Sequence, residues 1–131
     1  MIGGTTRMVR EIPLYVGAAA IFVWGVAHLM ATRPIVHGFG PISLDNRRVI
    51  AMEWIVEGVA LCGVGLLVSL VTILEGPDNP AAVITYRVLA GMLVVFAGIT
   101  ALTGSRTTVL PMKMCPFIDA GVAVLFVLGS T

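Results

Sequence analysis

The sequence contains few charged residues. Only 11% of its 131 residues are Asp, Glu, Lys or Arg, whereas 58% are hydrophobic, and the mean hydropathy is +1.03. A soluble domain carries about 25% charged residues, because its water-facing surface requires them. This shortage excludes an ordinary soluble domain and predicts a membrane protein.

The sequence also lacks a clear excess of charge of either sign. Eight Lys and Arg residues stand against seven Asp and Glu residues. Proteins that bind nucleic acid need a basic surface to neutralise phosphates. We therefore expect no nucleic-acid partner.

Motifs for metal and redox chemistry are missing as well. No His-x-x-x-His, Glu-x-x-His or Cys-x-x-Cys spacing occurs, and there is no covalent haem motif. Cys62 and Cys115 are expected at different depths of their helices, too far apart for a disulfide. We expect two free thiols, no metal site and no organic cofactor.

What the sequence does contain is four long apolar segments. A helix needs about 20 residues to cross the ~30 Å hydrocarbon core of a bilayer, and the first three segments reach that length. Short polar or Gly- and Pro-containing stretches separate them. We predict one all-α domain over residues 1–131, an integral membrane up-down four-helix bundle with helices at about residues 12–31, 49–74, 82–103 and 108–130.

The first and fourth segments leave alternatives open. A cleavable signal peptide is the alternative for the first segment. Its apolar run exceeds the usual ~7–15 residues and holds Trp24 and His28, which favours a retained helix. In the fourth segment, Pro111 and Pro116 predict an interrupted start and a continuous helix only from Cys115 onward, with Asp119 as a candidate cap.

Residues 32–46 are predicted to form a linker. Pro34 and Pro41 are expected to stop helix propagation. The stretch is too apolar for a free aqueous loop, so it is either an interfacial connector or a cap over a cavity mouth. Ser43 or Asp45 is expected to cap the second helix.

Small residues indicate where the helices approach one another. Membrane helices associate through such positions, because lipid gives no net drive to bury one apolar side chain against another. The candidate contact positions are Gly17, Ala20, Gly58, Cys62, Gly65, Gly91, Gly98 and Gly121.

Two carboxylates lie inside the second apolar segment. Glu53 and Glu57 are four residues apart, which places both on one helix face, about 6 Å apart along the axis. A charge at the bilayer centre costs about 2.5–3.5 kcal/mol, so buried acids usually face a bundle interior or a wet cavity. Because two neighbouring carboxylates repel, one tends to stay protonated, which provides an acid beside a base.

The up-down order brings other polar residues to the same side of the membrane. His28 ends the first helix and Asp119 begins the fourth, so both are expected near the two acids. We predict a one-sided polar chamber with Glu57, Glu53, His28 and Asp119 as catalytic residues and with Trp24, Trp54, Arg33 and Arg47 as substrate-binding residues. The alternatives are structural roles, namely an interfacial Glu53 paired with an arginine and a His28 bonded to a carbonyl.

The charge of the loops predicts an orientation. The first and third loops hold five Lys or Arg residues, and the rest of the chain holds three. The positive-inside rule places these odd-numbered loops in the cytoplasm of a bacterial or other cell membrane.

Two stretches carry a family resemblance. The Gly-x-x-His-Leu pattern at Gly25–Leu29 and the acid-bearing stretch at Glu53–Gly58 resemble the DoxX-like group of small four-helix membrane proteins. The resemblance implies a bundle that works beside redox or quinone-linked proteins, or as an assembly factor. It carries over no catalytic residue.

Two classes of function follow as hypotheses. The first is a membrane protein, single or homo-oligomeric, that binds a lipophilic small molecule and acts on it as an acid–base isomerase or hydrolase. The alternative is a non-catalytic accessory or assembly subunit of a larger membrane complex. Proton-coupled transport is disfavoured, because the sequence predicts no discontinuous helix near the midplane.

Overall fold

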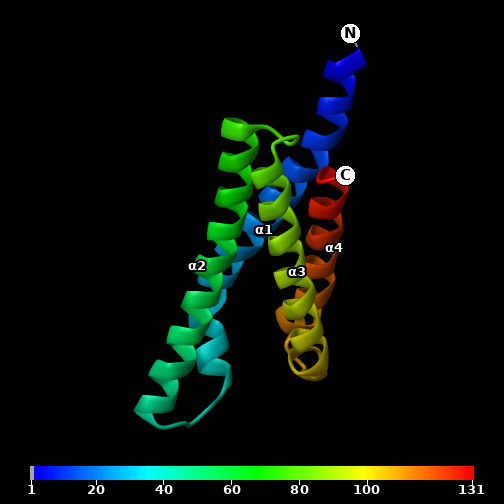
Figure 1. The fold of residues 1–131 in the computed structure, drawn as a ribbon. Coiled ribbons are helices and arrows are strands. Elements are labelled where there is room, and N and C mark those ends of the chain that lie inside the picture. Colours follow the sequence, from blue (N-terminus) through cyan, green and yellow to red (C-terminus); the bar gives the residue numbers. More distant parts are fainter. Residues whose placement is uncertain (1) are drawn as a thin grey trace.

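The computed structural model describes the backbone of residues 2–131 and the side chains from residue 7 onward. Within this part of the chain there are four α-helices, one short 3-10 helix and no strand. Successive long helices run in opposite directions (Figure 1). The elements are α1 (Ile2–Gly38), α2 (Leu44–Glu75), α3 (Pro80–Leu102), η1 (Gly104–Arg106) and α4 (Leu110–Gly129). The predicted all-α, four-helix architecture is confirmed.

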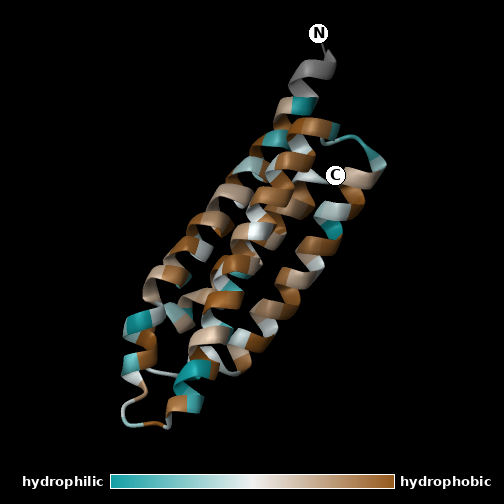
Figure 2. Ribbon diagram, turned by 90° about the vertical axis from the view of Figure 1, so that its left-hand side faces the viewer, coloured by the Kyte–Doolittle hydropathy of each residue, from teal (hydrophilic) through white to brown (hydrophobic). Residues whose placement is uncertain are grey.

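All four helices are long and apolar enough to cross a membrane. Figure 2 shows hydrophobic residues along most of each helix and hydrophilic residues mainly toward the helix ends and turns. Many outward-facing side chains are large and apolar, among them Met30, Leu74 and Phe117.

The end of α1 differs from the prediction. The helix continues through Pro34 to Gly38, so the predicted linker shrinks to the few residues before Leu44. A proline inside a helix removes one backbone hydrogen bond and costs about 3 kcal/mol. Val36 is buried beyond Pro34, so packing of the last turn offsets this loss.

The cap predicted for α2 is confirmed, whereas the start predicted for the fourth helix is not. Ser43 caps α2, because its hydroxyl accepts a hydrogen bond from the Asn46 amide at 3.2 Å, as predicted. The interrupted start predicted for the fourth helix is wrong, since α4 is continuous from Leu110. Pro111 lies in the first turn, where the missing N–H has no intrahelical partner to lose. Asp119 therefore lies inside the helix and caps nothing.

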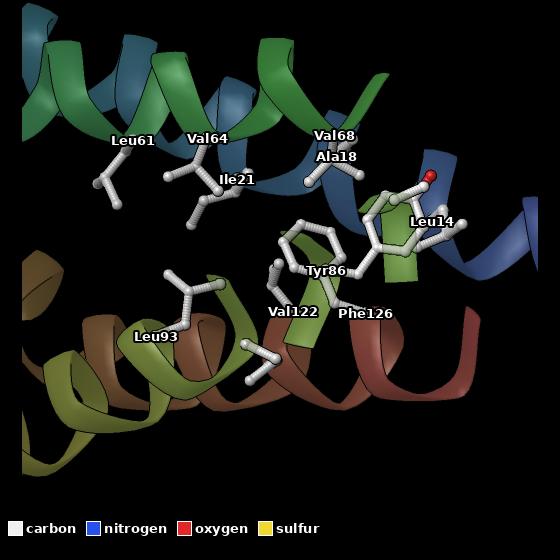
Figure 3. Packing of buried hydrophobic residues seen from close by; sticks show 13 residues of the cluster. Leu14, Ala18, Ile21, Leu61, Val64, Val68, Tyr86, Leu93, Val122 and Phe126 are labelled. Carbon is white, nitrogen blue, oxygen red and sulfur yellow. The ribbon is translucent and has the colours of Figure 1, made fainter. Parts of the chain in front are cut away.

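The helices form two hairpins. α1 packs along α2 and α3 along α4, and the hairpins meet chiefly through α1 and α4, whereas α2 and α3 touch little. Figure 3 shows buried side chains of the two hairpins facing one another. This core includes Leu14, Ala18, Ile21, Leu61, Val64, Val68, Tyr86, Leu93, Val122 and Phe126.

Small residues bring α1 and α2 together. A Cβ added at Gly65 would lie 2.5 Å from the carbonyl oxygen of Ala18, and one added at Gly25 would lie 2.8 Å from that of Gly58. Backbones at this separation leave no room for any side chain. The predicted contacts at Gly58 and Gly65 are confirmed, and Gly25 is a further one.

The predicted close contacts through small residues are wrong for α3 and α4, and also for Ala20 of α1. A Cβ added at Gly91, Gly98 or Gly121 would meet nothing within 4 Å, and Ala20 is exposed. α3 and α4 nevertheless pack along one another without these glycines at the contact. Gly17 does lie at a contact, against the ring of Phe126.

The hairpins have unequal lengths. At 1.5 Å per residue, α2 is about 48 Å long and α3 about 35 Å. A short turn joins them at one end, so the α1–α2 hairpin extends about 13 Å beyond the α3–α4 hairpin at the other end (Figure 1). Counting 23 residues back from Glu75 puts Glu53 level with the end of α3.

Polar contacts fasten the opposite end of the molecule. Arg10 forms an ion pair with Asp78 and donates to the Pro77 carbonyl at 3.2 Å, which ties α1 to the turn between α2 and α3. Arg87 donates to the Ser130 carbonyl at 3.1 Å, which ties α3 to the end of α4.

Candidate functional site

His28 lies at the centre of a buried cluster. Its side chain projects from α1 and is 3% exposed. The ring of Trp54 lies nearly parallel to it, with centroids 4.3 Å apart, and the ring of Trp24 meets it edge-on at 5.9 Å. Trp54 also donates its indole N–H to the His28 carbonyl at 2.6 Å. These contacts hold the imidazole in one orientation.

Glu57 connects this cluster to the protein surface. Its Oε2 lies 3.6 Å from Nε2 of His28, an ion-pair distance when the imidazole is protonated but longer than a hydrogen bond. The Glu57 side chain is 41% exposed. The carboxylate of Glu57 therefore faces a buried imidazole and is also partly accessible from outside.

The accessible side of Glu57 borders a groove between α2 and α3. The groove has a volume of about 400 Å³ and exists because these two helices touch little. Its size is within the range of small-molecule sites, about 300–1,000 Å³. It is lined by Glu53, Val56, Glu57 and Ala60 from α2 and by Phe96, Ile99 and Thr100 from α3.

α4 contributes Cys115 and Asp119 to the buried side of the site. Both are 4% exposed, and Asp119 lies within electrostatic range of Glu57 and His28. Oδ1 of Asp119 and Nε1 of Trp24 are buried without a hydrogen-bond partner among the described residues. Such atoms are costly in an apolar interior, and they are candidates for contact with a ligand or water.

A second, smaller cavity also borders His28. Its volume is about 120 Å³, and Trp24, His28 and Trp54 form part of its wall. The remaining lining residues are Ala27, Ala31, Leu110, Pro111 and Met114.

The structure brings most of the predicted site residues together. Glu57 lies beside His28, Asp119 is near both, and the two tryptophans pack on the imidazole. Glu53 shares the groove with Glu57. Instead of one chamber, however, the polar residues form an open groove and a buried cluster that share Glu57.

The predicted arginines stand apart from this site. Arg33 and Arg47 are exposed, and neither makes an ion pair or hydrogen bond with an acid in the described part of the chain. Glu53 likewise has no cationic partner there. Among the described residues, therefore, no arginine forms an ion pair with either acid of the groove.

The groove also contains residues that the sequence did not single out. Phe96 and Ile99 form the wall opposite the acids, and they are indistinguishable in sequence from the other apolar residues of α3. Cys115 was expected to be a free thiol, and it is one, as is Cys62. The neighbours of Cys115, which are Trp24 and the buried Asp119, were not predictable from spacing.

The fold and site define a class, an all-α protein with four apolar helices and a carboxylate-lined lateral groove. Comparison with protein-family models, with curated proteins and with solved structures finds no match. The resemblance to the DoxX-like group therefore stays a prediction. Among the described residues, no group of three or more His, Cys, Asp or Glu side chains is arranged to share a metal ion.

Proposed function

We propose that this chain is a multi-pass integral membrane protein that binds a lipophilic small molecule in the groove between α2 and α3. Four helices long and apolar enough to span a bilayer support the location, as does the largely apolar outer surface. In water, so much exposed apolar surface would cause association.

The helix lengths indicate how the groove lies in the bilayer. α3 and α4, about 35 and 30 Å long, match a hydrocarbon core of about 30 Å. Glu53, level with the end of α3, is then near the headgroups, and Glu57 is about 6 Å deeper. An acid at this depth costs less than one at the midplane, and water reaches it from the interface. The overhanging end carries Arg33, Arg47 and Arg48, which fits a cytoplasmic location.

One observation carries the proposal, namely that Glu57 belongs both to the groove and to the buried His28 cluster. A ligand that enters from the lipid meets apolar walls at Val56, Phe96 and Ile99 and a polar region at the two acids. Glu57 then takes a proton from the ligand or delivers one to it, and His28, 3.6 Å behind it, stabilises the charge. This arrangement supports isomerisation or hydrolysis of a lipophilic substrate.

The first experiment tests ligand binding. The protein is purified from membranes in a mild detergent, and the lipophilic compounds that remain bound are extracted and quantified by mass spectrometry. We expect a near-stoichiometric compound with the wild type. Ala60→Trp should remove it by filling the groove, whereas Val59→Trp, on the neighbouring exposed face of α2, should retain it. Equal recovery from both variants would refute the groove as the site.

The second experiment tests the acid–base role. Once the compound is identified, its turnover is measured with wild type, Glu57→Gln and Glu53→Gln. Loss of one positioned acid or base costs about 10²–10⁴ in rate, and we expect that loss for Glu57→Gln. Full activity of folded Glu57→Gln would remove Glu57 from the chemistry and leave binding alone.

The alternative function uses the same open groove differently. Because α2 and α3 touch little, a helix of another subunit could lie between them, as in an accessory subunit of a redox or quinone-linked complex. Stoichiometric recovery of the chain with larger subunits, without a bound small molecule, favours this alternative. Recovery as a discrete homo-oligomer or monomer with a bound compound favours the ligand-binding function.

A further inference from the structure

A second groove lies where the α1–α2 hairpin extends past the α3–α4 hairpin. Its volume is about 420 Å³. One side is formed by the last turn of α1 and the following residue, the other by the segment between η1 and α4 and the first turn of α4. The lining residues are Pro34, Ile35, Gly38, Phe39, Thr107, Val109 and Met112, of which only the threonine is polar.

In the sequence, a cation stands next to each segment that lines this groove. Arg33 precedes Pro34, Arg106 precedes Thr107, and Lys113 follows Met112. All three cations are exposed, and none makes an ion pair within the described residues.

Acids are absent from the same parts of the chain. No Asp or Glu occurs between residues 12 and 44 or between residues 79 and 118. The segments that line the groove therefore combine apolar side chains with neighbouring charges of one sign. An occupant that complements both features is an anion attached to a hydrocarbon chain.

We infer that this groove binds a phospholipid with an anionic headgroup, with one acyl chain against Ile35, Phe39 and Val109 and the headgroup phosphate near Arg106 and Lys113. The groove lies at the beginning of α4 and the end of α3, the level at which headgroups meet a spanning helix. Each Lys or Arg near an anionic lipid surface contributes about 1 kcal/mol. The inference requires membrane insertion but no catalytic activity, and it is independent of the groove that contains Glu57.

Native mass spectrometry tests the inference with two probes, phosphatidylglycerol and phosphatidylcholine with identical acyl chains. We expect the wild type to retain phosphatidylglycerol preferentially. The variant Arg106→Gln/Lys113→Gln should bind it about 25-fold more weakly, since 1 kcal/mol corresponds to roughly fivefold. The matched control is Arg47→Gln/Arg48→Gln, which removes the same charge from exposed positions of α2 that do not flank the groove and should change the affinity little.

A third variant tests the hydrocarbon part of the site. Val109→Trp should fill the groove and weaken phosphatidylglycerol binding with every cation still present. Circular dichroism establishes that each variant retains its helix content. Equal affinity for the two lipids, equal losses in the two charge variants, or full binding by Val109→Trp would each overturn the inference.

Discussion

Gly65→Ala offers a sharp test of how α1 and α2 pack. The added Cβ would lie 2.5 Å from the carbonyl oxygen of Ala18 and 2.9 Å from Cβ of Phe22. A carbon and a carbonyl oxygen approach no closer than about 3.3 Å, so the two helices must separate by about 0.8 Å. Neither neighbour is the flexible end of a side chain, so the strain spreads along the helix pair. Overpacking of this kind costs about 1–3 kcal/mol.

Gly63→Ala is the matched control for this variant. Gly63 lies in the same helix, two residues earlier, and a Cβ there would meet nothing within 4 Å. Both substitutions gain the same helix propensity, up to about 1 kcal/mol, so their difference isolates the clash. We expect Gly65→Ala to be less stable than Gly63→Ala by about 1–3 kcal/mol.

Reversible unfolding in mixed micelles, followed by far-UV circular dichroism, measures both variants against the wild type. Equal free energies of unfolding for Gly65→Ala and Gly63→Ala would show that α1 and α2 are not in backbone contact at this position. Small residues would then not be what holds these two helices together.

Two further predictions concern the buried cluster. Trp54→Phe should destabilise the protein by about 1 kcal/mol, because it removes the 2.6 Å hydrogen bond to the His28 carbonyl but keeps an aromatic ring. Trp24→Phe should cost less, since its buried N–H has no hydrogen-bond partner among the described residues, and the opposite order of stabilities would contradict the assignment. Asp119→Leu should stabilise the fold by about 1–3 kcal/mol, because it removes a buried carboxyl oxygen that has no hydrogen-bond partner in the described part of the chain. A lower free energy of unfolding in the same assay would show that Asp119 is satisfied in the native state.

The stabilisation expected for Asp119→Leu bears on function. A buried carboxyl group with an unpartnered oxygen does not serve stability, and strained polar groups of this kind are found at functional sites. If Asp119→Leu stabilises the protein and also reduces ligand turnover, Asp119 belongs to the site. Stabilisation with unchanged turnover would show that Asp119 has no role in the reaction.

Part of the site followed from spacing alone. The four-residue interval between Glu53 and Glu57 places both on one helix face, and both line the same groove. The alternating direction of the helices places His28 at the level of Glu57. Neither inference needs tertiary information, because helix geometry fixes the first and chain connectivity fixes the second.

Other features could not be predicted from the sequence, because they depend on contacts between helices. Pro34 lies inside α1, although proline usually ends a helix, since the burial of Val36 outweighs this local preference. Gly91 and Gly98 look like helix contact positions but face open space. Gly65 has the same local character and lies against a backbone, and only the mutual orientation of helices distinguishes them.

Composition and periodicity by themselves determined that this chain forms four apolar helices of membrane-spanning length. The length and hydrophobicity that suit a helix to a bilayer are properties of each segment alone, and they do not depend on the helices it packs against. Only the tertiary structure decided that α2 touches α3 little and that Glu57 therefore borders both an open groove and the buried His28. It also decided that, among the described residues, Arg33 and Arg47 form no ion pair with either acid. These outcomes depend on how whole helices are rotated and tilted against one another, and that is set by the summed packing of many side chains rather than by any local pattern.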